Sequence, residues 1–250
     1  MDIHLINLDR SGDRLEEFRR LNGAVPVNFI RSPAVDGSQI DRTRLVDEKR
    51  LDPVVSPYYT PGALGCALSH LALWQRAIET QETVTICEDD VIFNRRFADD
   101  AGTALAALGS EWDLVMWGWN FNSYLTFRML PGVSPCCATF DQQTMLAGLE
   151  TFREQQIDFR LFWLLRSFGT PCYSISPKGA GILSEHCLPL RPMPVYFPGL
   201  QRTVPNIGID IMMNDAYPRI NAMVSFPPLV IVKNEHSTST VLSPDWHAAQ

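Results

Sequence analysis

The sequence lacks long apolar runs, a zinc-type cysteine spacing and a glycine-rich phosphate loop. No apolar stretch approaches the roughly 20 residues that a membrane-spanning helix needs. Residues 1–5 have neither the basic nor the apolar region of a signal peptide, so we expect a cytosolic protein. The six cysteines show no CxxC spacing, which argues against a zinc site and indicates mostly buried free thiols. The missing GxxxxGK[ST] and GxGxxG motifs weaken a kinase or dehydrogenase hypothesis.

Positive charge is also scarce. The formal net charge is −7, which argues against a nucleic-acid partner, because phosphate contacts need a basic face. It equally argues against attachment to anionic lipid by charge alone. With 250 residues, 46% of them hydrophobic and 20% charged, the chain has the composition of an ordinary soluble globular protein.

One stretch joins a strand pattern to three successive acids. Residues 83–87 are mostly β-branched or apolar and run directly into Glu88, Asp89 and Asp90. This pattern is typical of a buried strand of a parallel sheet, and the carboxyl ends of such strands are where ligands bind. Three adjacent carboxylates repel one another, and a divalent cation would offset their charge. The alternative is a solvated acidic turn without a ligand.

Strand and helix patterns alternate along the rest of the chain, and the β–turn–α opening predicts a doubly wound α/β sheet. Further strands are expected at 3–8, 27–30, 112–117, 169–176 and 226–232, and helices at 13–21, 63–80, 98–108 and 178–186. Residues 144–165 are expected to contain one or two helices, and residues 189–205 a proline-rich loop.

Several polar side chains lie where a ligand could bind. Arg14 comes near the start of the first predicted helix, which suits an anion, or it is a solvated surface residue. Asp36 precedes Gly37 and could hold a hydroxyl such as that of a ribose, or the pair could form only a turn. His70 interrupts an apolar helix surface, where a structural histidine is commoner than a ligand.

Two later segments carry further candidates. Residues 118–122 place aromatic rings beside amides after a strand, which could form a platform for a sugar or only a packed corner. Asp210 lies inside an apolar run, and a buried acid with a raised pKa is suited to act as a general base. A helix N-cap is the competing explanation.

Taken in order, these motifs resemble glycosyltransferase family 25, which includes lipooligosaccharide galactosyltransferases and, more distantly, collagen galactosyltransferases. The most specific pair is a helix similar to the family's GxxGCxxSH signature followed by its EDD motif. Residues 120–165 match poorly. The matching stretches are 6–10 with Arg14, 34–37, 62–70 with Trp74, 88–90, 169–170 with Tyr173 and Ile175-Ser176, and Ile209-Asp210.

The resemblance implies a GT-A type α/β fold, in which a Rossmann-like mixed sheet is flanked by helices. It implies a single glycosyltransferase domain over residues 1–250, with a nucleotide-sugar-binding half, 1–120, and an acceptor-side half, 121–250. By the same analogy, the donor is contacted by Asn7, Leu8, Arg14, Asp36, Gly37, Ser69, His70, Glu88, Asp89 and Asp90. Acceptor contacts are expected from Trp117, Trp119, Asn120, Thr170 and Tyr173.

The resemblance further implies an inverting transfer of a hexose from a UDP-sugar with the help of Mn²⁺ or Mg²⁺. Asp90 and His236 would bind the metal, and Glu88 would contact the ribose or a metal-bound water. A hard cation on oxygen ligands neutralises the diphosphate leaving group. Inversion needs a carboxylate that deprotonates the acceptor, for which Asp210 is the expected residue and Asp215 the reserve.

We expect UDP-galactose or UDP-glucose as donor and a lipid-linked glycan of lipopolysaccharide or lipooligosaccharide as acceptor. Transient contact through aromatics in residues 152–165 would place the protein at the inner membrane face. A second hypothesis is a catalytically silent nucleotide-sugar-binding module that scaffolds an assembly complex. A third is a phosphohydrolase, which would release inorganic phosphate where a transferase releases UDP.

Overall fold

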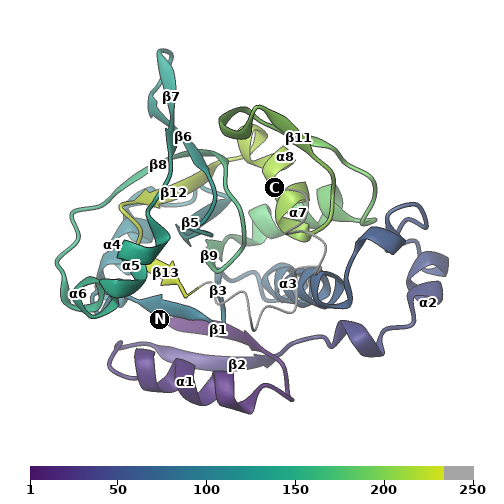
Figure 1. Ribbon diagram of the computed structural model, residues 1–250, viewed down its shortest axis with the longest axis horizontal. Helices are drawn as coiled ribbons and strands as arrows, with labels where there is room; N and C mark the ends of the chain where they lie inside the picture. The colour runs from purple at the N-terminus through teal and green to yellow at the C-terminus, as the bar shows by residue number, and fades with distance from the viewer. Residues whose placement is uncertain (234–250) are drawn as a thin grey trace.

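A mixed sheet runs through the computed structural model, which describes residues 1–233 (Figure 1). Within these residues its nine strands are ordered β2-β1-β3-β9-β5-β12-β8-β6-β7. The strands are β1 (Asp2–Asn7), β2 (Asn28–Pro33), β3 (Val84–Glu88), β5 (Leu114–Gly118), β6 (Leu125–Leu130), β7 (Ser134–Ala138), β8 (Arg160–Arg166), β9 (Cys172–Ile175) and β12 (Ala222–Phe226).

The strand directions confirm the mixed α/β class that the sequence predicts. β1 runs parallel to β2 and β3, whereas β9 is antiparallel to both of its neighbours, β3 and β5. β12 is parallel to β5 and antiparallel to β8, and β8, β6 and β7 continue in antiparallel pairing. Two small sheets pair β4 (Val91–Phe93) with β13 (Val230–Val232), and β10 (Val195–Phe197) with β11 (Arg202–Val204).

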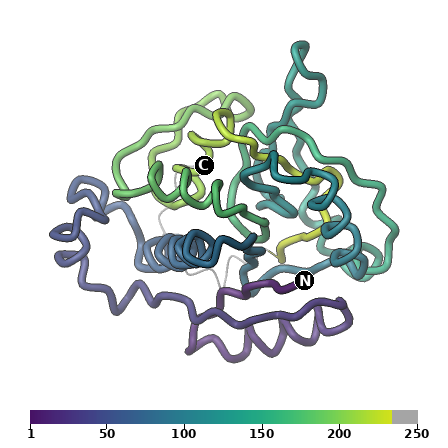
Figure 2. The backbone as a smooth tube through the Cα atoms, turned by 180° about the vertical axis from the view of Figure 1, so that it is seen from behind, coloured from purple at the N-terminus to yellow at the C-terminus, as the bar shows by residue number. Residues whose placement is uncertain are grey.

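Helices cover both faces of the sheet (Figures 1 and 2). In β3, Ile86 packs into a core with α3, α7 and α8, while its neighbour Cys87 packs into a second core with α1 and α4. Successive strand residues face opposite sides, so this alternation requires cover on both faces. The helices are α1 (Gly12–Asn22), α2 (Arg42–Asp47), α3 (Pro61–Thr80), α4 (Phe97–Leu108), α5 (Gln142–Ala147), α6 (Leu149–Glu154), α7 (Pro177–Cys187) and α8 (Ile209–Ala216).

Helix α3 is the element that stands directly behind the acids. Its start is fixed by Thr60, whose hydroxyl accepts from the Ala63 N–H at 3.0 Å, and by Pro61 in the first turn. The Gly37 backbone lies against this turn, and a Cβ added to Gly37 would come within 1.6 Å of the Pro61 carbonyl oxygen. Among residues 1–233, no helix has both the length and the apolar character that a membrane crossing requires.

The structure corrects two of the predicted segments and adds strands that the sequence did not predict. Residues 144–165 do contain two helices, α5 and α6, but the segment ends in strand β8. The spacing of the aromatic residues there fits the period of a helix as well as that of a strand. Residues 189–205 include the short strands β10 and β11 and are not only a loop. The β6–β7 hairpin and β12 were not predicted. Strands β6, β8 and β12 depend on pairing with partners distant in the sequence, which the local pattern does not contain.

Candidate active site at the end of strand β3

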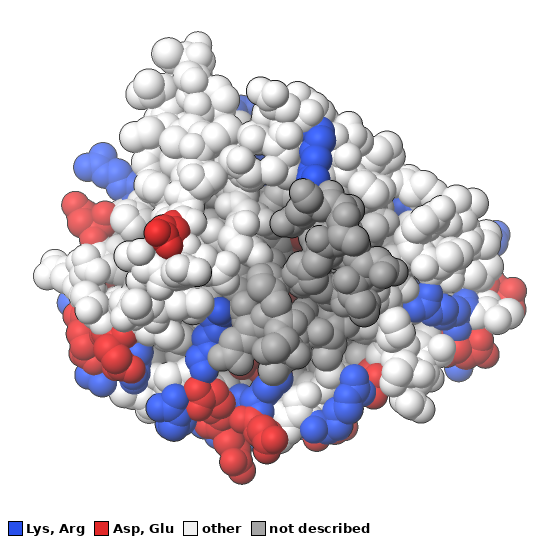
Figure 3. All heavy atoms as spheres, viewed as in Figure 1, with Lys and Arg blue, Asp and Glu red and all other residues white. Residues whose placement is uncertain are grey.

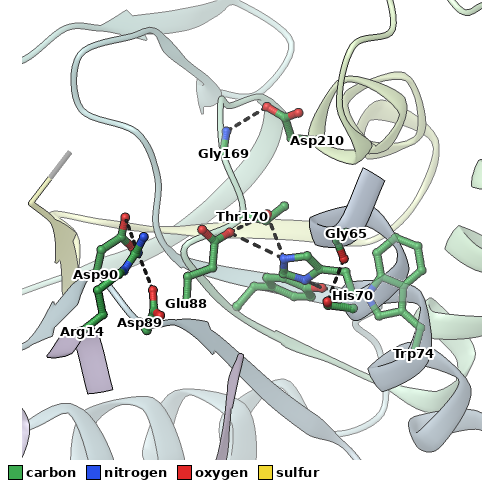
Figure 4. A network of polar contacts seen from close by, with 12 residues as sticks. Arg14, Gly65, His70, Trp74, Glu88, Asp89, Asp90, Gly169, Thr170 and Asp210 are labelled. Atoms are coloured by element: carbon green, nitrogen blue, oxygen red, sulfur yellow. Dashed lines mark hydrogen bonds and ion pairs between the residues drawn. The ribbon is translucent and has the colours of Figure 1, made fainter. Parts of the chain in front are cut away.

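The three acids lie at the carboxyl end of β3, as the sequence predicts. Glu88 is the last residue of the strand, and Asp89 and Asp90 form the turn before β4. Arg14, from α1, forms an ion pair with Asp89 and lies 3.5 Å from Asp90 (Figure 4). One guanidinium therefore offsets the charge of two carboxylates.

Asp89 is tied to the neighbouring strand. The Asn7 amide nitrogen donates to Asp89 Oδ2 at 2.7 Å, and the amide is oriented by Arg31, whose Nε donates to Asn7 Oδ1 at 3.0 Å. Asn7 thus contributes by holding an acid in place. Sequence reasoning missed Arg31, although it lies in β2, the strand next to Asn7 in β1.

The acids differ in their protonation behaviour. Burial, followed by the charge of Glu88, raises the pKa of Asp90 to about 7, against the opposing charge of Arg14. Burial also raises the pKa of Asp89, opposed by Arg14 and Asn7. Burial acts in the same direction on Glu88, but hydrogen bonds from His70 and Thr170, together with the charge of Arg14, outweigh it and leave its pKa lowered. Glu88 therefore loses its proton at a lower pH than Asp90 does.

A chain of hydrogen bonds leads from Trp74 to Glu88. Trp74 Nε1 lies 2.7 Å from the Tyr173 hydroxyl, which lies 2.8 Å from His70 Nδ1. On the other side of the imidazole, His70 Nε2 lies 3.1 Å from Thr170 Oγ1, which donates to Glu88 Oε1 at 2.9 Å. We call these five residues the Glu88 relay.

The available hydrogen-bond donors fix the direction of each hydrogen bond in the Glu88 relay. An indole N–H can only donate, so the Tyr173 hydroxyl accepts from Trp74 and gives its own proton to His70 Nδ1. The neutral imidazole then carries its proton on Nε2 and donates to Thr170. This assignment follows from the hydrogen-bond network. In it His70 donates to Thr170, and Thr170 donates to the ionised Glu88 carboxylate.

The relay includes two residues that were predicted to contact ligands. His70 and Tyr173 are fully buried, and their polar atoms are hydrogen-bonded to other members of the relay. Through Thr170 they orient the Glu88 carboxylate, so His70 acts as the structural histidine that the sequence analysis gave as an alternative to a ligand. Trp74 was noted as part of the matching motif but not as a site residue, and its spacing of four residues from His70 on one helix was the available signal.

Cys66, His70 and Glu88 place three ligand-type atoms within 4.8 Å of one another. The Thr170 hydroxyl hydrogen-bonds to all three side chains. Burial raises the pKa of the Cys66 thiol well above its usual value, which opposes formation of the thiolate that a metal needs. Hydrogen bonds therefore account for this cluster without a metal.

Asp90 fits a hard cation better. Its Oδ1 is enclosed and has no hydrogen-bond partner within residues 1–233. Carboxylate oxygens are the ligands that Mn²⁺ and Mg²⁺ accept, and a buried oxygen without a donor is the group that a cation would satisfy. His236, the second predicted ligand, lies outside the described residues.

Asp210 lies on the other side of the Gly169–Thr170 backbone from Glu88 (Figure 4). It is the second residue of α8, and the N-cap is Gly208, so the N-cap explanation is wrong. Its Oδ2 accepts from the Gly169 N–H at 3.0 Å. Burial raises the pKa of Asp210, and the N–H groups of Gly169 and Ile211 partly oppose this. A buried carboxylate with a raised pKa is suited to accept a proton near neutral pH.

Gly169 was part of a matching stretch, but it was not predicted as a site residue. Its φ of +74° lies in the left-handed region, and an added Cβ would come within 2.4 Å of Asn120 Oδ1. Asn120 therefore packs against the backbone that holds Asp210. The reserve base, Asp215, pairs instead with Arg219 and lies 3.3 Å from His186, away from the three acids.

The predicted aromatic platform is a packed corner. Trp117 and Trp119 are fully buried. Trp117 Nε1 donates to the Ser174 hydroxyl at 2.9 Å, and the Trp119 ring stacks on Phe226 with an interplanar angle of 16°. Both ring faces are covered by protein in this structure, which favours the packed corner over a sugar platform.

Other predicted donor contacts hold the loop at 34–38 against α3. Ser69 Oγ accepts from the Val35 N–H at 2.9 Å, and Asp36 accepts from the Ser38 N–H at 3.0 Å. Asp36 also pairs with Arg10. Leu8 is partly exposed directly after β1. The site therefore gathers Asn7, Arg14 and the three acids, and it leaves Ser69 and Gly37 as packing residues.

Comparison with known proteins supports the same class. A family model described as "Glycosyltransferase family 25 (LPS biosynthesis protein)" matches residues 1–197. A glycosyltransferase 25 family member from Drosophila melanogaster is 33% identical over 125 residues, which cover 46% of this chain and 20% of that protein. Procollagen galactosyltransferase 1-A from Xenopus laevis is 30% identical over 127 residues, covering 47% and 21%. The chain thus spans about one-fifth of the length of these curated relatives.

Similarity to solved structures is weak. A glycosyltransferase involved in the glycosylation of the major capsid of PBCV-1 is 11% identical, with a TM-score of 0.40 and coverage of 96% of this chain and 94% of that one. S. aureus TarS 1-349 is 14% identical, with a TM-score of 0.37 and coverage of 92% and 59%. At these scores neither similarity bears on the role of any residue.

Proposed function

The chain belongs to glycosyltransferase family 25, and we propose that it transfers a hexose from a UDP-sugar to a lipid-linked glycan. The observation that carries this proposal is the pairing of a cation-suited acidic turn, Glu88 to Asp90, with a separate, half-buried carboxylate, Asp210. Relatives named as procollagen galactosyltransferases favour galactose as the sugar. The family's description as an LPS biosynthesis protein favours a lipopolysaccharide glycan as the acceptor.

In this proposal residues 1–120 bind the donor, and residues 121–250 face the acceptor. Asp90 would hold Mn²⁺ or Mg²⁺ through its enclosed Oδ1, and Glu88 would bind the ion or one of its waters. A bound divalent cation would neutralise the diphosphate leaving group. Arg14 already supplies a positive charge beside the acids, and a guanidinium also suits phosphate oxygens.

Asp210 would act as the general base. The Gly169 N–H fixes one carboxylate oxygen, so the group is oriented before a substrate arrives. Its raised pKa makes it basic enough to take the proton of an acceptor hydroxyl as that oxygen attacks the anomeric carbon. Attack from the face opposite the diphosphate would invert the configuration of the sugar. A lipid-linked acceptor would bring the protein to the inner face of a membrane.

The experiment is a turnover assay on purified protein with Mn²⁺, UDP-galactose or UDP-glucose, and a panel of glycan acceptors. We expect UDP release that depends on the acceptor, and a glycosylated product of inverted configuration. The Asp210→Asn variant should lose about 10²- to 10⁴-fold in transfer rate while keeping its affinity for Mn²⁺ and UDP. Release of inorganic phosphate instead would indicate a phosphohydrolase. Binding without turnover over the whole panel would indicate a silent binding module.

A further inference from the structure

The β6–β7 hairpin projects from the body of the protein. Figures 1 and 2, which view the molecule from opposite sides, both show it standing clear of the other elements. Its base is buried at Leu125–Phe127, whereas the eight consecutive residues 128–135 are all exposed. The tip therefore has no cover from the rest of the described chain.

The exposed tip is apolar. Met129, Leu130 and Val133 are 52%, 56% and 80% exposed. Single exposed apolar side chains are ordinary, but three within five residues of one turn form a patch at the most prominent point of the molecule. Pro131 and Gly132 lie between them and make the turn, so the patch is convex.

The hairpin is also free of acids. In a chain with 28 acidic residues, residues 123–140 contain none, and Arg128 is their only charged residue. Figure 3 shows the projection as uncharged, while red and blue side chains gather elsewhere on that face. In the adjoining strand β8, the exposed Trp163 is paired with Arg128. Trp and Arg both suit the boundary between lipid tails and headgroups.

The geometry disfavours a protein partner. The hairpin's outer strand, β7, contains Pro135, which has no N–H to donate to a further strand, so pairing with a second copy is blocked there. A convex turn of a few residues is too small for a stable protein interface, which needs about 800 Å² from each partner. A lipid surface needs no matching shape, because its tails adapt to the inserted side chains.

We infer that the hairpin tip inserts into the surface of a lipid bilayer. Met129, Leu130 and Val133 enter the acyl boundary, and Arg128 and Trp163 lie at the level of the headgroups. The contact is weak and reversible, because three side chains bury little area and the net charge of −7 is repelled by an anionic surface. This inference goes beyond the proposed transfer and does not depend on it.

The test is flotation of the full chain with vesicles of phosphatidylcholine, with and without phosphatidylglycerol, at physiological ionic strength. The double variant Leu130→Asp/Val133→Asp should bind at least about tenfold more weakly than the parent, because two apolar contacts become charged. The matched control is Val54→Asp/Tyr58→Asp, which adds the same charge at side chains that are 63% and 66% exposed in the loop before α3. The control should bind within about twofold of the parent.

Three results would overturn the inference. The first is a parent protein that does not float with either vesicle. The second is a control variant that loses as much binding as the tip variant, which would make net charge the cause. In the third case the parent self-associates through the tip without binding vesicles, and the occupant is then a second copy. Independently, Val133→Trp should gain fluorescence that brominated acyl chains quench, and a tip that stays unquenched also contradicts insertion.

Discussion

The His70 imidazole and the Glu88 carboxylate are joined through the Thr170 hydroxyl, which lies 3.1 Å from His70 Nε2 and 2.9 Å from Glu88 Oε1. Two strands and one helix meet at this point, since Glu88 ends β3, Thr170 precedes β9 and His70 lies in α3. The direction of the Glu88 carboxylate is therefore set by buried residues. Changes in those residues should affect the site without touching a substrate.

Tyr173→Phe tests the Glu88 relay. The variant leaves the Trp74 N–H and His70 Nδ1 buried without partners, which should cost about 1–3 kcal/mol in the free energy of unfolding. The released imidazole should weaken binding of UDP with Mn²⁺ by about threefold to tenfold, since Glu88 is no longer held in one direction. Urea unfolding and calorimetry measure the two effects.

The control for this variant is Tyr196→Phe, at an exposed tyrosine, which should change neither quantity. Nitrogen NMR of the parent adds an independent check, because the relay requires the His70 proton on Nε2. If that proton were on Nδ1, or if Tyr173→Phe lowered stability but left nucleotide affinity untouched, the relay would be structural only.

Asp90→Asn tests the charge balance of the acidic turn. The folded pKa of Asp90 is raised to about 7, well above the value of an unfolded aspartate. The folded protein thus binds the extra proton, so the stabilising contribution is complete below the unfolded pKa and is lost as pH rises through about 7. Asn carries no charge, so in the absence of metal the variant should gain melting temperature relative to the parent as pH rises.

Thermal unfolding from about pH 5 to about pH 8 measures this difference. Asp158→Asn, at an exposed acid, is the control for loss of a surface charge and should follow the parent at every pH. A difference between Asp90→Asn and the parent that shrinks with rising pH would mean that Asp90 is already ionised at low pH in the folded state.

Gly169→Ala tests the backbone between the two carboxylate sites. Alanine at a φ of +74° is strained, and its Cβ would meet the Asn120 amide. We expect a loss of about 1–3 kcal/mol in the free energy of unfolding, together with reduced transfer, because the Gly169 N–H no longer holds Asp210. Gly102→Ala, in α4 with open space around its Cβ, should instead be stabilising by about 0.5–1 kcal/mol. Equal shifts in urea unfolding for both variants would exclude a special role for Gly169.

The sequence predicts the central part of the fold well because the signals there are local. The apolar and β-branched residues of β3 (Val84–Glu88) are typical of a strand that is covered on both faces, and Thr60 with Pro61 is a local signal for the start of a helix. Strand β8 is different, because its pairing with β12 joins residues about sixty positions apart. The aromatic spacing of 152–165 does not contain that information.

The same limit applies to the site. The acids, Arg14 and Asn7 lie at strand and helix ends, where order along the chain is enough to bring them together. The partners of His70 depend on how α3 packs against the sheet. Only the structure shows that His70 is hydrogen-bonded to Tyr173 and, through Thr170, to Glu88. Trp117 and Trp119 follow a strand end as a sugar platform would, but tertiary packing buries both.

The central claim is that the acidic turn after β3 binds a metal–nucleotide, and calorimetric titration of UDP in the presence of Mn²⁺ tests it most directly. We expect the parent to bind UDP only when Mn²⁺ is present, with release of a proton that grows as pH falls below about 7, because Asp90 must ionise to bind the ion. Asp90→Asn should lower the affinity at least about tenfold and abolish the proton release. Binding of UDP by the parent that is independent of metal, or binding by Asp90→Asn that matches the parent, would contradict the account.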